Sequence, residues 1–255
     1  MTLALIRVPA STINDCELTY LDRAPIDFTR AQQQHRAYCA ALARCGARVV
    51  TLPARAEFPD SVFVEDTAII FAECAVITAP GALSRRAEVE LSAAELARYR
   101  PLARIASPAT IDGGDVLRIG KKVFVGLSQR TNPAGIDALR ELIAPFGYEV
   151  SAVPVRGCLH LKTGCTALDD HTLLANPDWI DLAPLREFEI VNIARAEPFA
   201  ANVLRIGETI LAHLFPATIR LIEQRGYAVF PIDISEFIKA EAGLTCMSLL
   251  IENLE

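Results

Sequence analysis

The stretch VLRIGKKVFVGL at residues 116–127 places a glycine between two apolar runs that are rich in β-branched residues. A second stretch, VLRIGETILAH at residues 203–213, opens with the same five letters and resumes as an apolar run after its glycine. Glycine between two such runs is typical of a tight β-hairpin, because it adopts the backbone angles that the turn needs. The chain therefore contains a repeated strand–turn–strand unit.

Strand-like runs alternate with amphipathic helical stretches along the rest of the chain, which indicates an α/β protein. Helices are predicted over 28–45, 85–99, 133–146 and 216–225. Strands are predicted in residues 1–9 and over 47–52, 61–71, 74–78, 115–120, 122–127, 148–155, 172–176, 188–193, 202–207, 208–213, 227–233 and 246–252.

Polar residues stand at the start of five successive units with nearly constant spacing. They are Asp66, Asp112, His160, Asn202 and Cys246, at steps of 42 to 48 residues. The spacing favours five ββαβ units that close on themselves, with the first unit completed by the C-terminal strand. The alternative is an ordinary α/β protein with loosely regular strands, since no repeat identity at a fixed period is present.

Composition and charge exclude several classes of protein. The chain has 255 residues, of which 52% are hydrophobic and 22% charged, and we expect one domain over residues 1–255. A net charge of −6 argues against a nucleic-acid partner and suits a small cationic substrate. No apolar run reaches the ~20 residues of a membrane span. Seven cysteines without a regular framework predict reduced thiols and a cytoplasmic location, and nothing in the sequence predicts an oligomeric state.

Cys246 lies directly before an apolar run, in the stretch GLTCMSLLI at residues 243–251. A cysteine in such a position is often a small buried hydrophobic residue. Its reactivity depends on neighbouring groups.

His160 lies in the stretch GCLHLKTG at residues 157–164, which alternates with period two and predicts a strand with the histidine near its middle. A zinc site could be drawn from Cys158, His160 and Cys165. It lacks a fourth ligand and the usual paired spacing, so no metal is predicted.

Acidic residues gather in two further stretches. FPDSVFVEDT at residues 58–67 holds Asp60, Glu65 and Asp66 in an apolar run, where adjacent carboxylates are costly unless a cation is bound. Asp112 precedes a pair of glycines that let another group approach closely, and the spacing fits no dinucleotide or phosphate loop. Paired carboxylates match a guanidinium, which a thiolate could attack while a histidine protonates the departing amine.

Seven stretches together resemble the dimethylarginine dimethylaminohydrolases, members of the guanidino-group-modifying α/β-propeller (pentein) superfamily that also contains the arginine deiminases. The stretches are FPDSVFVEDTA, ITAPGALSRR, TIDGGDVL, VFVGLSQRTN, LHLKTG, AAN at 200–202 and LTCMS, in matching order and spacing over most of the chain. The resemblance implies a five-bladed pseudo-symmetric α/β propeller with its active site in the central channel. It also implies hydrolysis of Nω-methylated arginines to citrulline and methylamine or dimethylamine, without a cofactor.

The resemblance further implies a role for each matching residue. Cys246 would attack the guanidinium carbon to form a thiouronium, His160 would protonate the leaving amine and then activate water, and Asp112 would orient His160 and hold the guanidinium. The implied substrate-binding residues are Glu65 and Asp66 for the guanidinium, Arg85 and Arg130 for the α-carboxylate, and Asp60 with the carbonyls of Leu18 and Ala240 for the α-amino group. Leu18 would belong to a lid within residues 11–25.

Two departures from the family pattern border the expected α-amino end of the substrate. Glu241-Ala242 stands where Asp-Gly is usual, and Glu17 stands where glycine is frequent. An added acid there favours a more cationic ligand, so the exact substrate is left open.

Three alternatives to this function were considered. Deimination of arginine or a related guanidine differs only in the room around the terminal nitrogens, although the chain is too short for the helical insert of arginine deiminases. A non-catalytic binding protein on the same fold would have no reason to keep Cys246, His160 and Asp112 together. A plain α/β protein with an accidental cysteine would not carry seven matching stretches.

Overall fold

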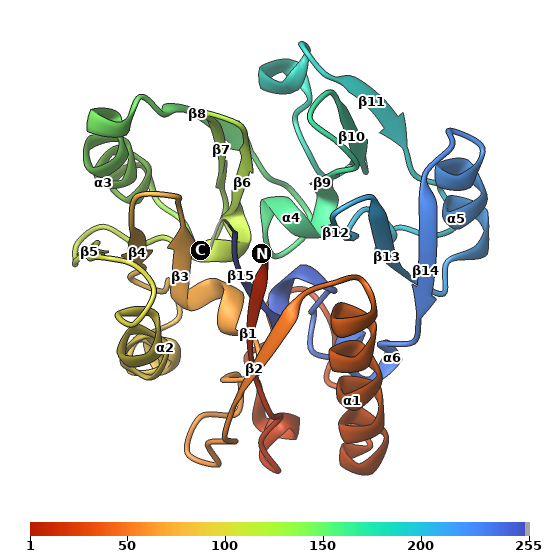
Figure 1. Cartoon of the computed structure of the whole chain (residues 1–255), viewed down its shortest axis with the longest axis horizontal. Coiled ribbons are helices and arrows are strands. Elements are labelled where there is room, and N and C mark those ends of the chain that lie inside the picture. The colour runs from red at the N-terminus through yellow and green to blue at the C-terminus, as the bar shows by residue number, and fades with distance from the viewer. Residues whose placement is uncertain (253–255) are drawn as a thin grey trace.

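Five three-stranded sheets stand around a common centre in the computed structural model, which describes residues 1–252 (Figure 1). In each sheet the middle strand pairs antiparallel with one neighbour and parallel with the other. Blades 1 to 5 are β15-β1-β2 (Leu249–Ile251, Leu3–Arg7, Arg48–Leu52), β3-β4-β5 (Ala68–Ile70, Ala75–Ile77, Leu102–Arg104), β6-β7-β8 (Val116–Ile119, Lys122–Leu127, Glu149–Pro154), β9-β10-β11 (Cys165–Ala167, Thr172–Ala175, Glu189–Asn192) and β12-β13-β14 (Leu204–Ile206, Thr209–His213, Ala228–Ile232).

Helices connect the parallel strands and lie at the outer edge of the ring (Figure 1). They are α1 (Phe28–Arg44), α2 (Val89–Leu96), α3 (Pro133–Ile143) and α5 (Pro216–Glu223), each within a stretch predicted to be helical. Blade 4 crosses instead through the 3-10 turn Ala183–Leu185. Within the described residues, no helix combines the length and apolarity that a membrane span requires.

The two hairpins quoted from the sequence form as predicted. Ile119 pairs with Lys122 and Ile206 with Thr209, which leaves a two-residue loop in each case. Gly120 and Gly207 open these loops, both with a φ of 57°. A positive φ is unfavourable for other residues, so the glycines determine where each strand pair turns.

The ring closes through blade 1, as the spacing predicted. Strand β15 pairs antiparallel with β1, and Leu3 lies opposite Ile251. The five ββαβ units of the sequence analysis are thus confirmed, and the first is completed by the C-terminal strand.

The apolar core consists of five clusters, one between each pair of adjacent blades. Each middle strand contributes side chains to the clusters on both of its faces, because alternate residues point to opposite sides. In β1, Leu3 and Leu5 face blade 2 while Ala4 and Ile6 face blade 5. A strand directs successive side chains to opposite faces, so a middle strand with two buried faces is apolar throughout.

The strand predicted through His160 is wrong. His160 precedes the short helix α4 (Leu161–Gly164), and the first strand of blade 4 begins only at Cys165. The Leu161 N–H donates to the Asp115 carboxylate at 2.9 Å, and Thr163 Oγ1 accepts the His160 N–H at 3.3 Å. These contacts hold the segment in a helical turn despite its alternating pattern.

A short helical turn also precedes the first strand in three other blades. These turns are Val64–Thr67, Gly113–Asp115 and Thr245–Met247, so the strands predicted over 61–71 and 246–252 are shorter than expected. Asp66 and Cys246 lie in these turns, and Asp112 and His160 directly precede Gly113–Asp115 and α4, whereas Asn202 lies before β12 outside any of them.

Candidate active site

A cavity of about 20 Å³ lies at the centre of the five blades and brings together the turns that precede four of the first strands. Asp66, Asp112, His160 and Cys246 all line it. The remaining lining residues are Glu17, Asp60, Phe63, Arg85, Arg130, Leu159, Ala240, Glu241 and Ala242. Of the residues predicted for the site, only Leu18 and Glu65 do not line this cavity.

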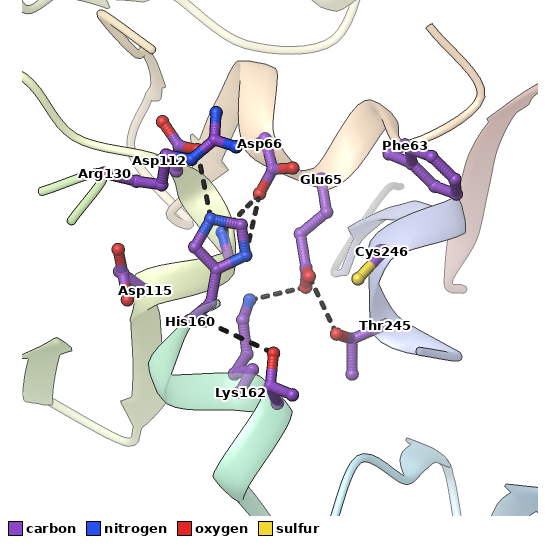
Figure 2. A network of polar contacts seen from close by, with 12 residues as sticks. Phe63, Glu65, Asp66, Asp112, Asp115, Arg130, His160, Lys162, Thr245 and Cys246 are labelled. Atoms are coloured by element: carbon purple, nitrogen blue, oxygen red, sulfur yellow. Dashed lines mark hydrogen bonds and ion pairs between the residues drawn. The ribbon is translucent and has the colours of Figure 1, made fainter. Parts of the chain in front are cut away.

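The imidazole of His160 is held between two carboxylates (Figure 2). Its Nε2 lies 3.0 Å from Asp112 Oδ2, and its Nδ1 lies 3.8 Å from Asp66 Oδ1 without a hydrogen-bond partner. Gly114 permits this packing, because a Cβ at that position would lie 2.6 Å from His160 Nδ1. The ring is therefore oriented by Asp112, and Nδ1 is left to serve a ligand.

The surrounding carboxylates favour a protonated His160. Burial opposes the charge, but Asp66, Asp115 and Asp112 outweigh it and raise the pKa of His160 to about 9. Burial in turn raises the pKa of Asp115 to about 6. Near neutral pH the imidazole is consequently a proton donor, as a general acid must be.

Cys246 occupies the 3-10 turn Thr245–Met247 and is 7% exposed. The Gly243 N–H donates to its Sγ at 3.3 Å. Burial, followed by the charges of Glu65 and Asp66, raises the pKa of the Cys246 thiol. The sulfur is therefore a neutral thiol in the unliganded protein.

Asn202 braces the turn that carries Cys246. Its side-chain oxygen accepts the Thr245 N–H at 3.1 Å, and its amide nitrogen donates to Thr245 Oγ1 at 3.0 Å and to the Lys162 carbonyl at 2.8 Å. The repeat residue of blade 5 thus positions Cys246 from behind instead of lining the cavity.

Arg85 is buried in a cluster of acidic and carbonyl groups. Its Nη1 donates to Asp66 Oδ2 at 2.5 Å, its Nη2 to Glu88 at 2.9 Å, and Nη2 also to the carbonyl of Phe63 at 3.0 Å. Burial opposes the charge of Asp66, but His160 and Arg85 outweigh it and lower the pKa of that carboxyl. Arg85 keeps Asp66 ionised beside the cavity.

Glu65 does not line this cavity, and its carboxylate joins Lys162 and Thr245 (Figure 2). Its carboxylate accepts hydrogen bonds from Lys162 Nζ at 2.5 Å and Thr245 Oγ1 at 2.7 Å. Burial raises the pKa of Glu65, and Lys162 opposes this shift. This group also borders a second central cavity of about 240 Å³.

The segment predicted as a lid covers the active-site cavity. Asp60 accepts the Glu17 N–H with both oxygens at 3.2 Å, and Arg130 Nη2 donates to Thr19 Oγ1 at 2.9 Å. Leu18 lies between these contacts and is half-buried. The structure thus brings Leu18 to the rim of the site, although its side chain does not line the cavity.

Comparisons with known proteins agree with this geometry. A family model described as arginine deiminase matches residues 56–204. The N(G),N(G)-dimethylarginine dimethylaminohydrolase of Pseudomonas aeruginosa is 36% identical over 248 residues, which cover 96% of this chain and 97% of that protein. The chain belongs to the dimethylarginine dimethylaminohydrolase family. The enzyme of that name from Streptomyces coelicolor is 37% identical over 255 residues, covering 98% and 97% of the two chains.

The five-bladed architecture is shared with solved structures of this dimethylarginine dimethylaminohydrolase family. The Pseudomonas aeruginosa protein, as a cysteine-to-serine mutant complexed with citrulline, matches with a TM-score of 0.91 at 35% identity. The match covers 97% of this chain and 98% of that one. The pentein fold predicted from the sequence is confirmed.

Several residues that act on the predicted site residues were not themselves predicted from the sequence. Asp115 is a buried acid that helps to raise the pKa of His160, and Glu88 is a buried acid that forms an ion pair with Arg85. Lys162 forms an ion pair with Glu65. Glu88 follows Arg85 by three residues, a spacing at which side chains meet on a helical turn. Asp115 and Lys162 gave no comparable signal, because the residues on which they act, His160 and Glu65, lie far away in the sequence.

One group of side chains in residues 1–252 comes close enough to hold a metal ion. Ligand atoms of Asp66, Asp112 and His160 lie within 4.8 Å of one another. All three groups already have partners, since Arg85 pairs with Asp66 and His160 Nε2 pairs with Asp112. A raised pKa for His160 also favours a proton over a metal at the imidazole.

Proposed function

We propose that the chain hydrolyses Nω-methylated arginines to citrulline and methylamine or dimethylamine. The observation that carries the proposal is the single cavity in which Cys246, the free Nδ1 of His160 and the carboxylates of Asp66 and Asp112 meet. A thiol, a proton donor and paired carboxylates are the groups that displacement of an amine from a guanidinium requires.

Substrate binding activates the thiol in this scheme. Burial and nearby carboxylates keep Cys246 protonated, and a bound guanidinium brings the positive charge that offsets them. The thiol releases its proton to solvent, and the thiolate Sγ forms a bond to the guanidinium carbon. His160 donates its Nδ1 proton to the methylated nitrogen, the C–N bond breaks, and the amine leaves a thiouronium on Cys246.

Hydrolysis of the thiouronium restores the protein. His160, now neutral, takes a proton from water, and the resulting hydroxide forms a bond to the same carbon. The C–Sγ bond then breaks as the added hydroxyl gives up its proton, so that its oxygen becomes the carbonyl of citrulline and Cys246 returns to the thiol. Asp112 holds the imidazole through Nε2 in both steps, so Nδ1 faces the reacting carbon throughout.

The same proposal assigns the binding residues. Asp66 and Asp112 take the guanidinium by direct contact, and Glu65 acts on its charge from behind the cavity. Arg130, with Arg85 behind it, receives the α-carboxylate. Asp60 and the carbonyls of Leu18 and Ala240 receive the α-amino group.

A citrulline assay tests the function directly. Asymmetric dimethylarginine, monomethylarginine and arginine are compared side by side, with Cys246→Ser as the blank. We expect citrulline from the two methylated substrates and none from the blank. Absence of citrulline from every substrate would reject methylated arginine as the substrate.

Deimination of arginine is the second candidate, since the matching family model is described as arginine deiminase. The same assay separates the two functions. Rapid turnover of plain arginine with release of ammonia would establish the deiminase, whereas turnover restricted to methylated arginines would exclude it.

A further inference from the structure

Glu241 is tied to the lid by its side chain. Its carboxylate accepts the backbone N–H groups of three consecutive lid residues, Thr19, Tyr20 and Leu21. The Thr19 nitrogen lies 3.0 Å from each carboxylate oxygen, and the Leu21 nitrogen lies 2.5 Å from Oε1. Such charge-assisted bonds to backbone groups are stronger than neutral ones. The carboxylate therefore holds the lid by its backbone.

The backbone of Glu241 is in an unusual conformation. With a φ of 58° it is the sole non-glycine residue of positive φ within residues 1–252. It closely follows helix α6 (Ser235–Ile238), a place where glycine is the common choice because it adopts this angle without strain. A glutamate in this backbone conformation is strained, and the hydrogen bonds of its side chain offset that strain.

The cavity beneath the lid is too small for an arginine derivative. Its volume of about 20 Å³ has room for roughly one water molecule. Glu17 from the lid and Glu241 both line it, so a substrate enters only when the lid moves away. Each turnover must therefore break and remake the bonds between Glu241 and residues 19–21.

Leu18 lies between two fixed peptide units. The Glu17 N–H is bound by Asp60, and the Thr19 N–H is bound by Glu241. These two carboxylates lie on either side of the position whose carbonyl we assign to the α-amino group. Any loosening at Glu241 moves one of the two supports of Leu18.

We propose that Glu241 is a positioning residue that latches the lid and thereby sets the Leu18 carbonyl for the α-amino end of the substrate. The proposal rests on the proposed function for its effect on catalysis, but the latch itself exists without substrate.

Hydrogen exchange on the full chain without substrate tests the latch. Glu241→Ala, Glu241→Gln and Glu241→Gly are compared with wild type at the amides of residues 19–21. We expect exchange about tenfold faster or more in the alanine and glycine variants, and less change in the glutamine variant because its amide oxygen still accepts N–H groups. Glycine removes the backbone strain, so it separates loss of the latch from loss of folding.

Glu197→Ala is the matched control. Glu197 also accepts two backbone N–H groups with its carboxylate, from Ala217 and Thr218 at 2.9 and 2.7 Å, but it lies away from the cavity. This variant should speed exchange at residues 217–218 and leave residues 19–21 and the kinetics unchanged. Equal exchange at residues 19–21 in wild type and Glu241→Ala would overturn the latch.

Kinetics with dimethylarginine complete the test. For Glu241→Ala and Glu241→Gly we expect KM to rise about tenfold or more while kcat changes much less, with partial rescue by glutamine. If Glu241→Gln raised KM as much as alanine while its lid amides kept wild-type exchange, Glu241 would bind the ammonium group directly and the latch would be rejected. If wild type made no citrulline, the proposed function would fail, and the exchange experiment would still decide the latch.

Discussion

The two central cavities are built by the same five blades, yet they differ in size and chemistry. The catalytic cavity has a volume of about 20 Å³ and is lined mainly by turns and by the lid. The second cavity, of about 240 Å³, is lined by first strands and by β15, with Arg118, Lys162 and Arg205 among its polar residues. Acids, a histidine and a thiol gather in the first, whereas apolar strand residues dominate the second.

The difference shows where this fold places its chemistry. Side chains on the strands are committed to the clusters between blades, so they carry few ionisable groups. The helical turns before the strands divide their side chains: Val64, Leu161 and Met247 join the clusters between blades, whereas acids, His160 and Cys246 line the catalytic cavity. Glu65 and Lys162 mark the border between the two regions.

Replacing His160 should remove the chemistry of the catalytic cavity and give the largest effect. We expect His160→Ala to slow both formation and breakdown of the thiouronium by about 10²–10⁴-fold, because Nδ1 donates a proton in the first step and accepts one in the second. Rapid-quench single turnovers with mass spectrometry of Cys246 follow the two steps separately. Unchanged rates for either step would contradict the role of His160, provided that circular dichroism shows an intact fold.

Replacing Lys162 tests the ion pair with Glu65 that lies between the two cavities. Lys162→Met should lower the free energy of unfolding by about 3–5 kcal/mol, because it leaves the buried Glu65 carboxylate without its cation. Lys122→Met is the control, since Lys122 pairs with Glu187 at the surface and such pairs contribute about 0–1 kcal/mol. Equal losses in the two variants on denaturant unfolding would show that Glu65 does not depend on Lys162.

A pH series sharpens the contrast at His160. Its pKa rises from 6.5 to about 9 on folding, so its contribution to stability is complete below pH 6.5 and is lost as pH rises through 9. We therefore expect the free energy of unfolding to fall over this window in wild type and less steeply in His160→Gln. Parallel slopes for the two proteins would refute the raised pKa.

The smallest effect is expected on the side of the second cavity. Arg205 is one-third exposed and pairs with Asp170 at 3.3 Å, so Arg205→Ala should change the free energy of unfolding by less than about 0.5 kcal/mol. Its citrulline kinetics should match wild type. A clear loss of kcat would mean that the second cavity takes part in the reaction.

The ring could be predicted from the hairpin glycines and the spacing of polar residues, which are local signals, whereas the set of site residues came from the resemblance of seven stretches to a known family. The turn at His160 could not, since the contact of Leu161 with Asp115 joins two blades and outweighs the alternation of the segment. Glu241 was noted as a departure in the sequence, but its hold on residues 19–21 depends on the folded path of the lid.

The pairing of β1 with β15 indicates that the ring closes late in folding. Leu3 meets Ile251 across nearly the whole described chain, so this contact has the highest loop-closure cost in the ring and is expected late in folding. Cys246 lies just before β15 and leaves the ribosome after the other four blades. Enzymatic activity is thus a reporter of ring closure. In refolding, recovery of helical signal should precede recovery of turnover.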